Sequence, residues 1–68
     1  MSAEELVRLE DAARGSPYAD VQITIVDKLQ FYGFKAIPVI RHIAEVSQFD
    51  EVKEYCDAAI NKLYYGES

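Results

Sequence analysis

An internal repeat spans most of this chain and constrains its fold more than any other sequence feature. When the sequence is shifted by 31 positions, residues of similar character coincide, as in the pairs Leu6 and Ile37, Leu9 and Ile40, Ser16 and Ser47, Ile25 and Cys56, and Leu29 and Ile60. A fixed period of this kind indicates stacked helical repeats. We therefore expect one domain over residues 1–68, with repeat one near 2–32 and repeat two near 33–65.

Within each repeat, apolar residues recur every three or four positions, which predicts helices rather than strands. Four antiparallel helices are expected, near residues 2–14, 17–32, 35–46 and 50–64. Gly15 and Gly33 mark two of the helix ends, because glycine readily takes the conformation that follows a helix C-terminus. The predicted fold class is all-α, with the helices arranged as two stacked helical hairpins.

Polar residues predict where three of these helices begin. Ser2 and Glu5 have the spacing of a capping box, in which each side chain accepts a hydrogen bond from the backbone N–H of the other residue. Ser16 is expected to cap the second helix, and Asp50 is expected to cap the fourth. These caps would fix the points at which the chain turns into each new helix.

The second helix has a wide apolar face when its residues are projected at about 100° per residue. Its expected core residues are Val21, Ile25, Val26, Leu29 and Tyr32. Tyr18 and Phe49 coincide in the repeat, and we expect both rings in the core. The third helix is apolar over roughly half of its circumference, so it is expected to lie at the centre of the fold.

Charge and cysteine content exclude several classes of protein. The chain has a net charge of −5, which disfavours nucleic-acid binding unless its basic residues share one face: Arg8, Arg14, Lys28, Lys35 and Arg41. No apolar run reaches the roughly 18 residues of a membrane span. The acidic balance also disfavours a polybasic membrane anchor, so we expect no membrane partner. A single cysteine permits no internal disulfide, so we expect a cytoplasmic protein.

The residues best able to carry chemistry are His42 and Cys56, the only residues of their types. We expect His42 to be a solvated helix histidine, since a general base needs a nucleophile and an orienting carboxylate. Cys56 occupies a predicted core position, where a thiol behaves as a small hydrophobic group. One histidine and one cysteine are too few for a zinc site. The sequence therefore predicts a protein that is not an enzyme and has no metal, cofactor or small-molecule substrate.

Two segments of the second repeat resemble a known pattern. AIPVI (Ala36 to Ile40) and DEVKEYCDAAINKL (Asp50 to Leu63) look like the two helices of a HEAT-like repeat. The acidic-Val-basic element of that pattern is Glu51-Val52-Lys53, and its counterpart Asp20-Val21-Gln22 lacks the basic residue. The period is shorter than the roughly 40 to 47 residues of ordinary HEAT or armadillo units. It is closer to the short HEAT-like repeats of the phycobilisome-lyase type, and the resemblance implies a protein-interaction scaffold in a short α-α superhelix.

Two hypotheses of function follow from this sequence. The first is a small non-catalytic interaction module, an adaptor or a subunit that helps to assemble a complex. The alternative is an accessory or regulatory subunit of an enzyme. Stacked repeats need about three units to bury a continuous core, and this chain has two, so we expect either a homodimer or a bound protein partner.

The predicted partner surface lies where the first repeat is apolar and the second is polar. Ile23 coincides with Glu54, and Phe31 coincides with Lys62. Adding the neighbouring positions gives a surface of Ile23, Asp27, Phe31, Glu54, Tyr55, Ala58 and Lys62. Its apolar residues would be covered by a partner, by a second copy or by the chain's own residues, three alternatives that the sequence leaves open.

Overall fold

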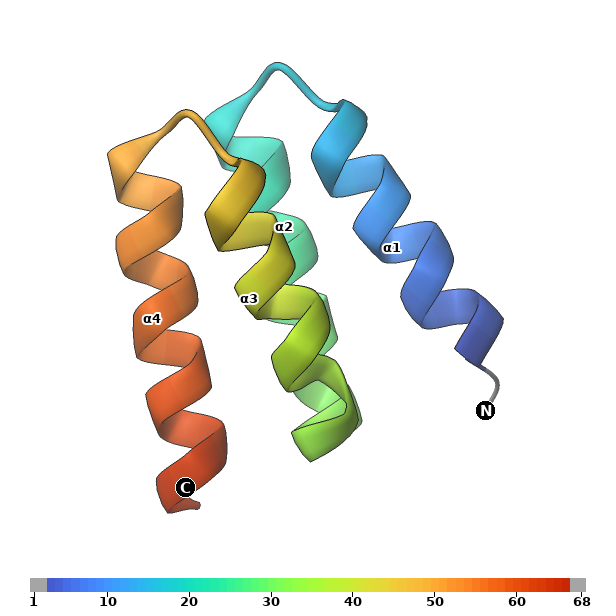
Figure 1. Cartoon of the computed structure of the whole chain (residues 1–68), viewed down its shortest axis with the longest axis vertical. Coiled ribbons are helices and arrows are strands. Elements are labelled where there is room, and N and C mark those ends of the chain that lie inside the picture. Colours follow the sequence, from blue (N-terminus) through green and yellow to red (C-terminus); the bar gives the residue numbers. More distant parts are fainter. Residues whose placement is uncertain (1–2, 67–68) are drawn as a thin grey trace.

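A computed structural model of the chain describes residues 3–66, which are almost entirely helical (Figure 1). The elements are α1 (Ala3–Gly15), α2 (Ala19–Leu29), the 3-10 helix η1 (Gln30–Ala36), α3 (Ile37–Val46) and α4 (Asp50–Tyr65). No strand occurs within the described residues, and the prediction of an all-α fold is confirmed.

The predicted count of four separate helices is wrong. Between Ala19 and Val46 only Gly33 departs from helical backbone angles, so the described residues form three helical segments, separated by the loops 16–18 and 47–49. Gly33 sits inside η1 with φ 68° and ψ −143°, which reverses the chain there. This positive φ is available to glycine because it has no Cβ. Gly33 thus makes the turn that we expected, but a tight helical connection takes the place of a loop.

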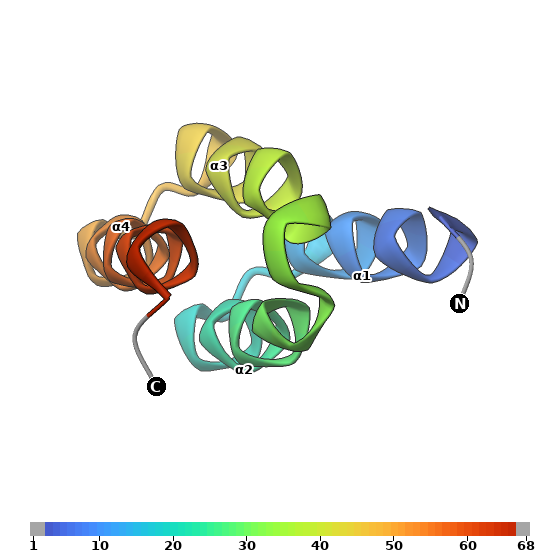
Figure 2. The same cartoon turned by 90° about the horizontal axis from the view of Figure 1, so that it is seen from below.

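The helical elements run alternately up and down, with the loops 16–18 and 47–49 at one end and η1 at the other (Figure 1). The main contacts pair α1 with α2, α3 with α4, α1 with α3 and α2 with α4. Seen from below, α2 and α3 lie between α1 on one side and α4 on the other (Figure 2). These pairings are those of two helical hairpins, α1–α2 and α3–α4, laid side by side.

The core lies where α2, α3 and α4 face one another. Its largest fully buried side chains are Leu29, Ile40, Ile43, Val26, Val52 and Cys56. From α1, Ala13 is fully buried, while Leu6 and Leu9 are only partly buried against the core. Because α1 contributes so little buried surface, most of the stabilisation from apolar burial comes from α2, α3 and α4.

The predicted core is wrong at the start of α2. Tyr18 is 63% exposed and Val21 is 40% exposed, although both were expected inside. The inward position is taken by Gln22, which is 4% exposed. Gln22 lies inside because its amide meets backbone carbonyl groups that need a donor there, and this turns Val21 outward. Tyr32 and Phe49 are half-buried and pack against the core.

The predicted caps at Ser16 and Asp50 are also wrong. The residues at the N-cap positions of α2 and α4 are Tyr18 and Phe49, both extended and without a side-chain cap. The serine two residues before each of these N-cap positions closes a turn with its side chain. Ser16 Oγ accepts from Tyr18 N at 3.1 Å, and Ser47 Oγ accepts from Phe49 N at 3.2 Å. Both loops therefore use the same turn. The predicted capping residue Ser2 lies outside the described residues.

Candidate functional site

A buried hydrogen-bond network joins the two loops of the protein. Gln22 Nε2 donates to the carbonyl oxygen of Ala13 at 3.0 Å and to that of Ser16 at 3.1 Å. Ser47 Oγ donates to Gln22 Oε1 at 2.9 Å. Among the described residues, every buried side-chain nitrogen or oxygen has a hydrogen-bond partner. The network therefore ties α1, α2 and the 47–49 loop together without leaving a buried polar group unsatisfied.

Sequence reasoning missed this role of Gln22. The available signal was the departure from the repeat pattern, since Gln22 stands where the second repeat has the exposed Lys53. A neutral amide both donates and accepts, so it can be buried between two loops. A lysine could not accept the hydrogen bond from Ser47 and would carry a charge into the core.

The structure brings together two residues of the predicted partner surface. Tyr55 on α4 donates to Asp27 Oδ1 on α2, and Gln30 Nε2 donates to the same oxygen at 3.3 Å. The hydrogen bond to Asp27 raises the pKa of Tyr55, and burial adds to the effect. Asp27 thus links the two helices on the face where the surface was predicted.

The other residues of this surface divide into two groups. Ile23 is half-buried and packs against the core, so the chain itself covers much of this side chain. Phe31 is 90% exposed, and Glu54, Ala58 and Lys62 are exposed on α4. Phe31 and Asp27 also line a common surface hollow. The surface as a whole stays a prediction, with Phe31 as its apolar residue that the chain leaves open.

Further aromatic side chains gather at the same end of the molecule. Phe34 on η1 is 65% exposed, and Tyr64 and Tyr65 at the end of α4 are 56% and 79% exposed. The ring centroids of Phe34 and Tyr64 lie 6.4 Å apart with a tilt of 51°. Figure 1 shows η1 and the C-terminal end of α4 at the end opposite the two loops. Tyr64 therefore packs beside η1, while Tyr65 stays open.

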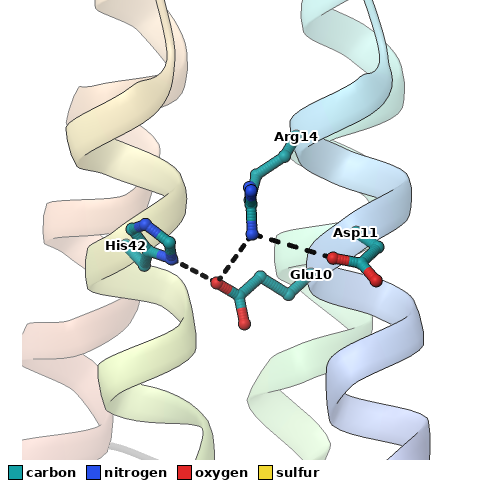
Figure 3. A network of polar contacts seen from close by, with 4 residues as sticks. All are labelled: Glu10, Asp11, Arg14 and His42. Atoms are coloured by element: carbon teal, nitrogen blue, oxygen red, sulfur yellow. Dashed lines mark hydrogen bonds and ion pairs between the residues drawn. The ribbon is translucent and has the colours of Figure 1, made fainter.

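His42 is not simply solvated, in contrast to the prediction. Its Nδ1 contacts Glu10 Oε2 across the interface of α3 and α1 (Figure 3). Arg14 Nη1 lies 3.8 Å from the same oxygen and 3.7 Å from Asp11 Oδ1. The four side chains form a partly exposed network, which orients α1 against α3.

Cys56 is fully buried, as predicted. Burial raises the pKa of its thiol to about 11, and the nearby Asp57 carboxylate adds to this shift. A thiol with such a pKa is a poor nucleophile at neutral pH. Within residues 3–66, no group of three or more histidine, cysteine or carboxylate side chains could hold a metal ion. No helix in that range is long and apolar enough to cross a membrane.

Comparison with known proteins gives no relative from which to infer a function. No family model, curated protein or solved structure matches the chain at a significant level. The functional inference therefore depends on the geometry of the chain alone.

Proposed function

We propose that this chain is a non-catalytic protein-interaction module that works in the cytoplasm, as an adaptor or an assembly subunit. The observation that carries the proposal is Phe31, whose ring is 90% exposed although the neighbouring Leu29 is fully buried. Exposed apolar patches mark interaction sites, and Phe31 on η1 lies at the end of the molecule where Phe34, Tyr64 and Tyr65 are exposed as well. Aromatic residues are also enriched among those that dominate binding energy.

The surroundings of Phe31 support the same proposal. Asp27 is held by Tyr55 and Gln30 beside it, so a polar rim of fixed geometry borders the exposed ring. Apolar centres with polar rims are typical of protein–protein interfaces. Of the predicted surface, we assign Phe31 as the apolar centre, and we assign Asp27, Tyr55 and the exposed α4 residues as its rim.

The partner is a second protein or a second copy of the chain. The internal repeat supports this proposal. The loops at Ser16–Tyr18 and Ser47–Phe49 have equivalent hydrogen bonds, as expected of two repeated units. If these units are short HEAT-like repeats, as their sequence suggests, two of them fall below the roughly three that stacked arrays need. Another protein surface would complete the stack.

Site-specific photo-crosslinking tests this function directly. We would place a benzophenone amino acid at Phe31 and, as a matched control, at Gln48, which is exposed on the loop at the opposite end. The proposal predicts a defined crosslinked protein from position 31 and none from position 48. Equal crosslinking from both positions, or from neither, would contradict it.

Sedimentation analysis identifies the kind of partner. A dimer of the purified chain that dissociates in Phe31→Ser would assign the second copy as the partner. A monomer with a crosslinked heterologous protein would assign an adaptor. If the captured protein is an enzyme whose rate changes on addition of the chain, the alternative of an accessory subunit is correct.

A further inference from the structure

A hollow of about 440 Å³ lies between the N-terminal half of α1 and the segment where α2 passes into η1. Six residues line it: Glu5, Arg8, Leu9, Lys28, Phe31 and Tyr32. Figure 1 shows α1 joined to α2 at the 16–18 loop and diverging from the other helices toward its N-terminus. Two other surface hollows have volumes of about 450 and 460 Å³. The lining, rather than the size, therefore distinguishes the hollow between α1 and α2.

The apolar part of this lining is held in place by the fold. Leu9 and Tyr32 are half-buried and pack against the core. The hydroxyl group of Tyr32 donates to Glu5 Oε1 at 3.1 Å, which joins η1 to α1 across the hollow. Phe31 adds an exposed ring at the edge. A preformed apolar floor of this kind lowers the ordering cost of binding a side chain.

The charged residues that line the hollow are mainly basic, whereas the chain as a whole is acidic. Arg8 and Lys28 both reach the hollow, and within residues 3–66 no ion pair includes either of them. By contrast, Arg14 on the same helix α1 lies near two carboxylates. Glu5 supplies the single carboxylate of the lining, and one of its oxygens already accepts from Tyr32. Two cations and one anion leave a local excess of positive charge in a chain whose net charge is −5.

We propose that the hollow between α1 and α2 binds a short acidic segment of a protein partner. One large apolar side chain of that segment packs against Leu9 and the rings of Phe31 and Tyr32. Carboxylates on either side of this residue lie beside Arg8 and Lys28. The inference rests on the proposed function, because Phe31 belongs to both surfaces, and it adds the chemistry that the partner must have.

Charge complementarity favours this occupant over the others. Nucleic acid is disfavoured because two cations are few compared with the roughly 6 to 10 phosphate contacts of a typical DNA-binding protein. The net charge of −5 opposes the approach of any acidic partner at long range, a second copy included, so the attraction must come from the local positive charge of the hollow. An acidic segment of a different protein needs to satisfy only the local positive charge and the apolar floor.

A peptide-display selection tests the proposal with the full chain. The probe is a random library of linear peptides displayed on phage and selected on the immobilised protein. Peptides enriched over the bare support should be acidic and should carry a large apolar residue flanked by Asp or Glu. Their affinity, measured with the synthetic peptides, should fall as salt is added, because the contacts with Arg8 and Lys28 are exposed.

Charge-reversal variants then locate the site. The double variant Arg8→Glu and Lys28→Glu should weaken the selected peptides by about tenfold or more. The control variant Lys35→Glu and Lys53→Glu alters the net charge equally at exposed positions outside the hollow, and it should change the affinity by less than about threefold. Circular dichroism of both variants should show unchanged helicity.

Each other outcome overturns the inference. Selection of no peptides, selection of peptides without acidic bias, or equal weakening in the two double variants would each reject the acidic segment. A dimer that Arg8→Glu and Lys28→Glu dissociates would assign the hollow to a second copy instead. If crosslinking from Phe31 still captures a protein in any of these cases, the proposed function stands while this inference fails.

Discussion

The two ends of this molecule are built in different ways. At the loop end, Gln22 and Ser47 are 4% and 5% exposed and bond to each other and to the backbone. At the opposite end, Phe31 and Tyr65 are 90% and 79% exposed, and the only aromatic ring pair within the described residues joins Phe34 to Tyr64. The loop end therefore has buried polar groups with partners. Tyr18 is exposed there too, at 63%, but the two most exposed rings of the described residues, Phe31 and Tyr65, lie at the η1 end.

This difference indicates that the loop end contributes more to the stability of the fold, while the η1 end has exposed surface available for binding a partner. Buried polar groups with all their partners specify one arrangement of the surrounding elements, because any other arrangement leaves donors or acceptors unpaired. Exposed rings contribute little to folding and keep their apolar surface for a partner. Substitutions at the loop end should therefore reduce stability, and substitutions at the η1 end should reduce binding.

The largest effect is expected from Gln22→Leu. This change keeps the volume of the side chain but removes the donor to Ala13 and Ser16 and the acceptor for Ser47. Leaving these groups buried and unpaired should lower the free energy of unfolding by about 2 to 4 kcal/mol. Urea denaturation followed by circular dichroism measures the change. Gln48→Leu, at an exposed loop position, is the control and should stay within about 0.5 kcal/mol; equal effects would disprove the role of the network.

A smaller loss is expected from Ser47→Ala than from Gln22→Leu. The serine hydroxyl group donates to Gln22 Oε1 and accepts from Phe49 N, so its removal should cost about 1 to 3 kcal/mol. The matched serine of the first repeat, Ser16, has no bond to Gln22 through its side chain, and Ser16→Ala should cost about 0.5 to 1 kcal/mol. A double-mutant cycle of Gln22→Leu and Ser47→Ala should show coupling of about 0.5 kcal/mol or more. Strict additivity would show that the two side chains act independently.

A pH-dependent loss of stability is expected from Cys56, in the core between the two ends. Its thiol titrates near 9.0 in the unfolded chain and near 11 in the native protein. The raised native pKa means that folding favours the neutral thiol, so this stabilisation is complete below pH 9.0 and is lost as pH rises toward 11. The wild type should therefore lose more stability over this range than Cys56→Ala, as measured by urea denaturation at several pH values. Parallel curves for the two proteins would contradict the shift.

The smallest effect on stability is expected from Phe31→Ser. Its ring is 90% exposed, so the free energy of unfolding should change by less than about 0.5 kcal/mol, while association with the partner is lost. Phe49→Ser, at the loop end, removes a ring that packs against the core and should cost about 1 to 3 kcal/mol. Denaturation of both variants measures the contrast, and a larger loss for Phe31→Ser would place this ring in the folded core.

Much of the fold was predictable because helical periodicity is a local property. Val26, Leu29 and Cys56 were all expected in the core, and all are fully buried. The positions of Gln22 and His42 were not predictable in the same way. Gln22 bonds to residues nine positions before it and 25 positions after it, and His42 contacts a residue 32 positions away. Helical periodicity relates residues only a few positions apart, so it could not predict contacts between residues so far apart in the sequence.

The predicted surface shows the same division within a single set of residues. Phe31 was correctly placed outside the apolar face of its helix, because the repeat has a polar residue at the matching position. Ile23 was placed beside it by the same argument, yet it packs against the core. The contact between Asp27 and Tyr55 depends on how α2 and α4 approach each other, which the projection of a single helix does not contain.

The sequence by itself did not determine the number of helical segments, but it determined the all-α fold class and most of the apolar core. Spacing along one chain is sufficient for these features, because a helix places residues three and four positions apart on one side. Only the tertiary structure decided that Gln22 lies inside and Val21 outside, and that α1 diverges to leave a hollow beside Arg8 and Lys28. The physical reason is that burial of a polar group depends on donors and acceptors from distant segments, which meet only when the helices pack.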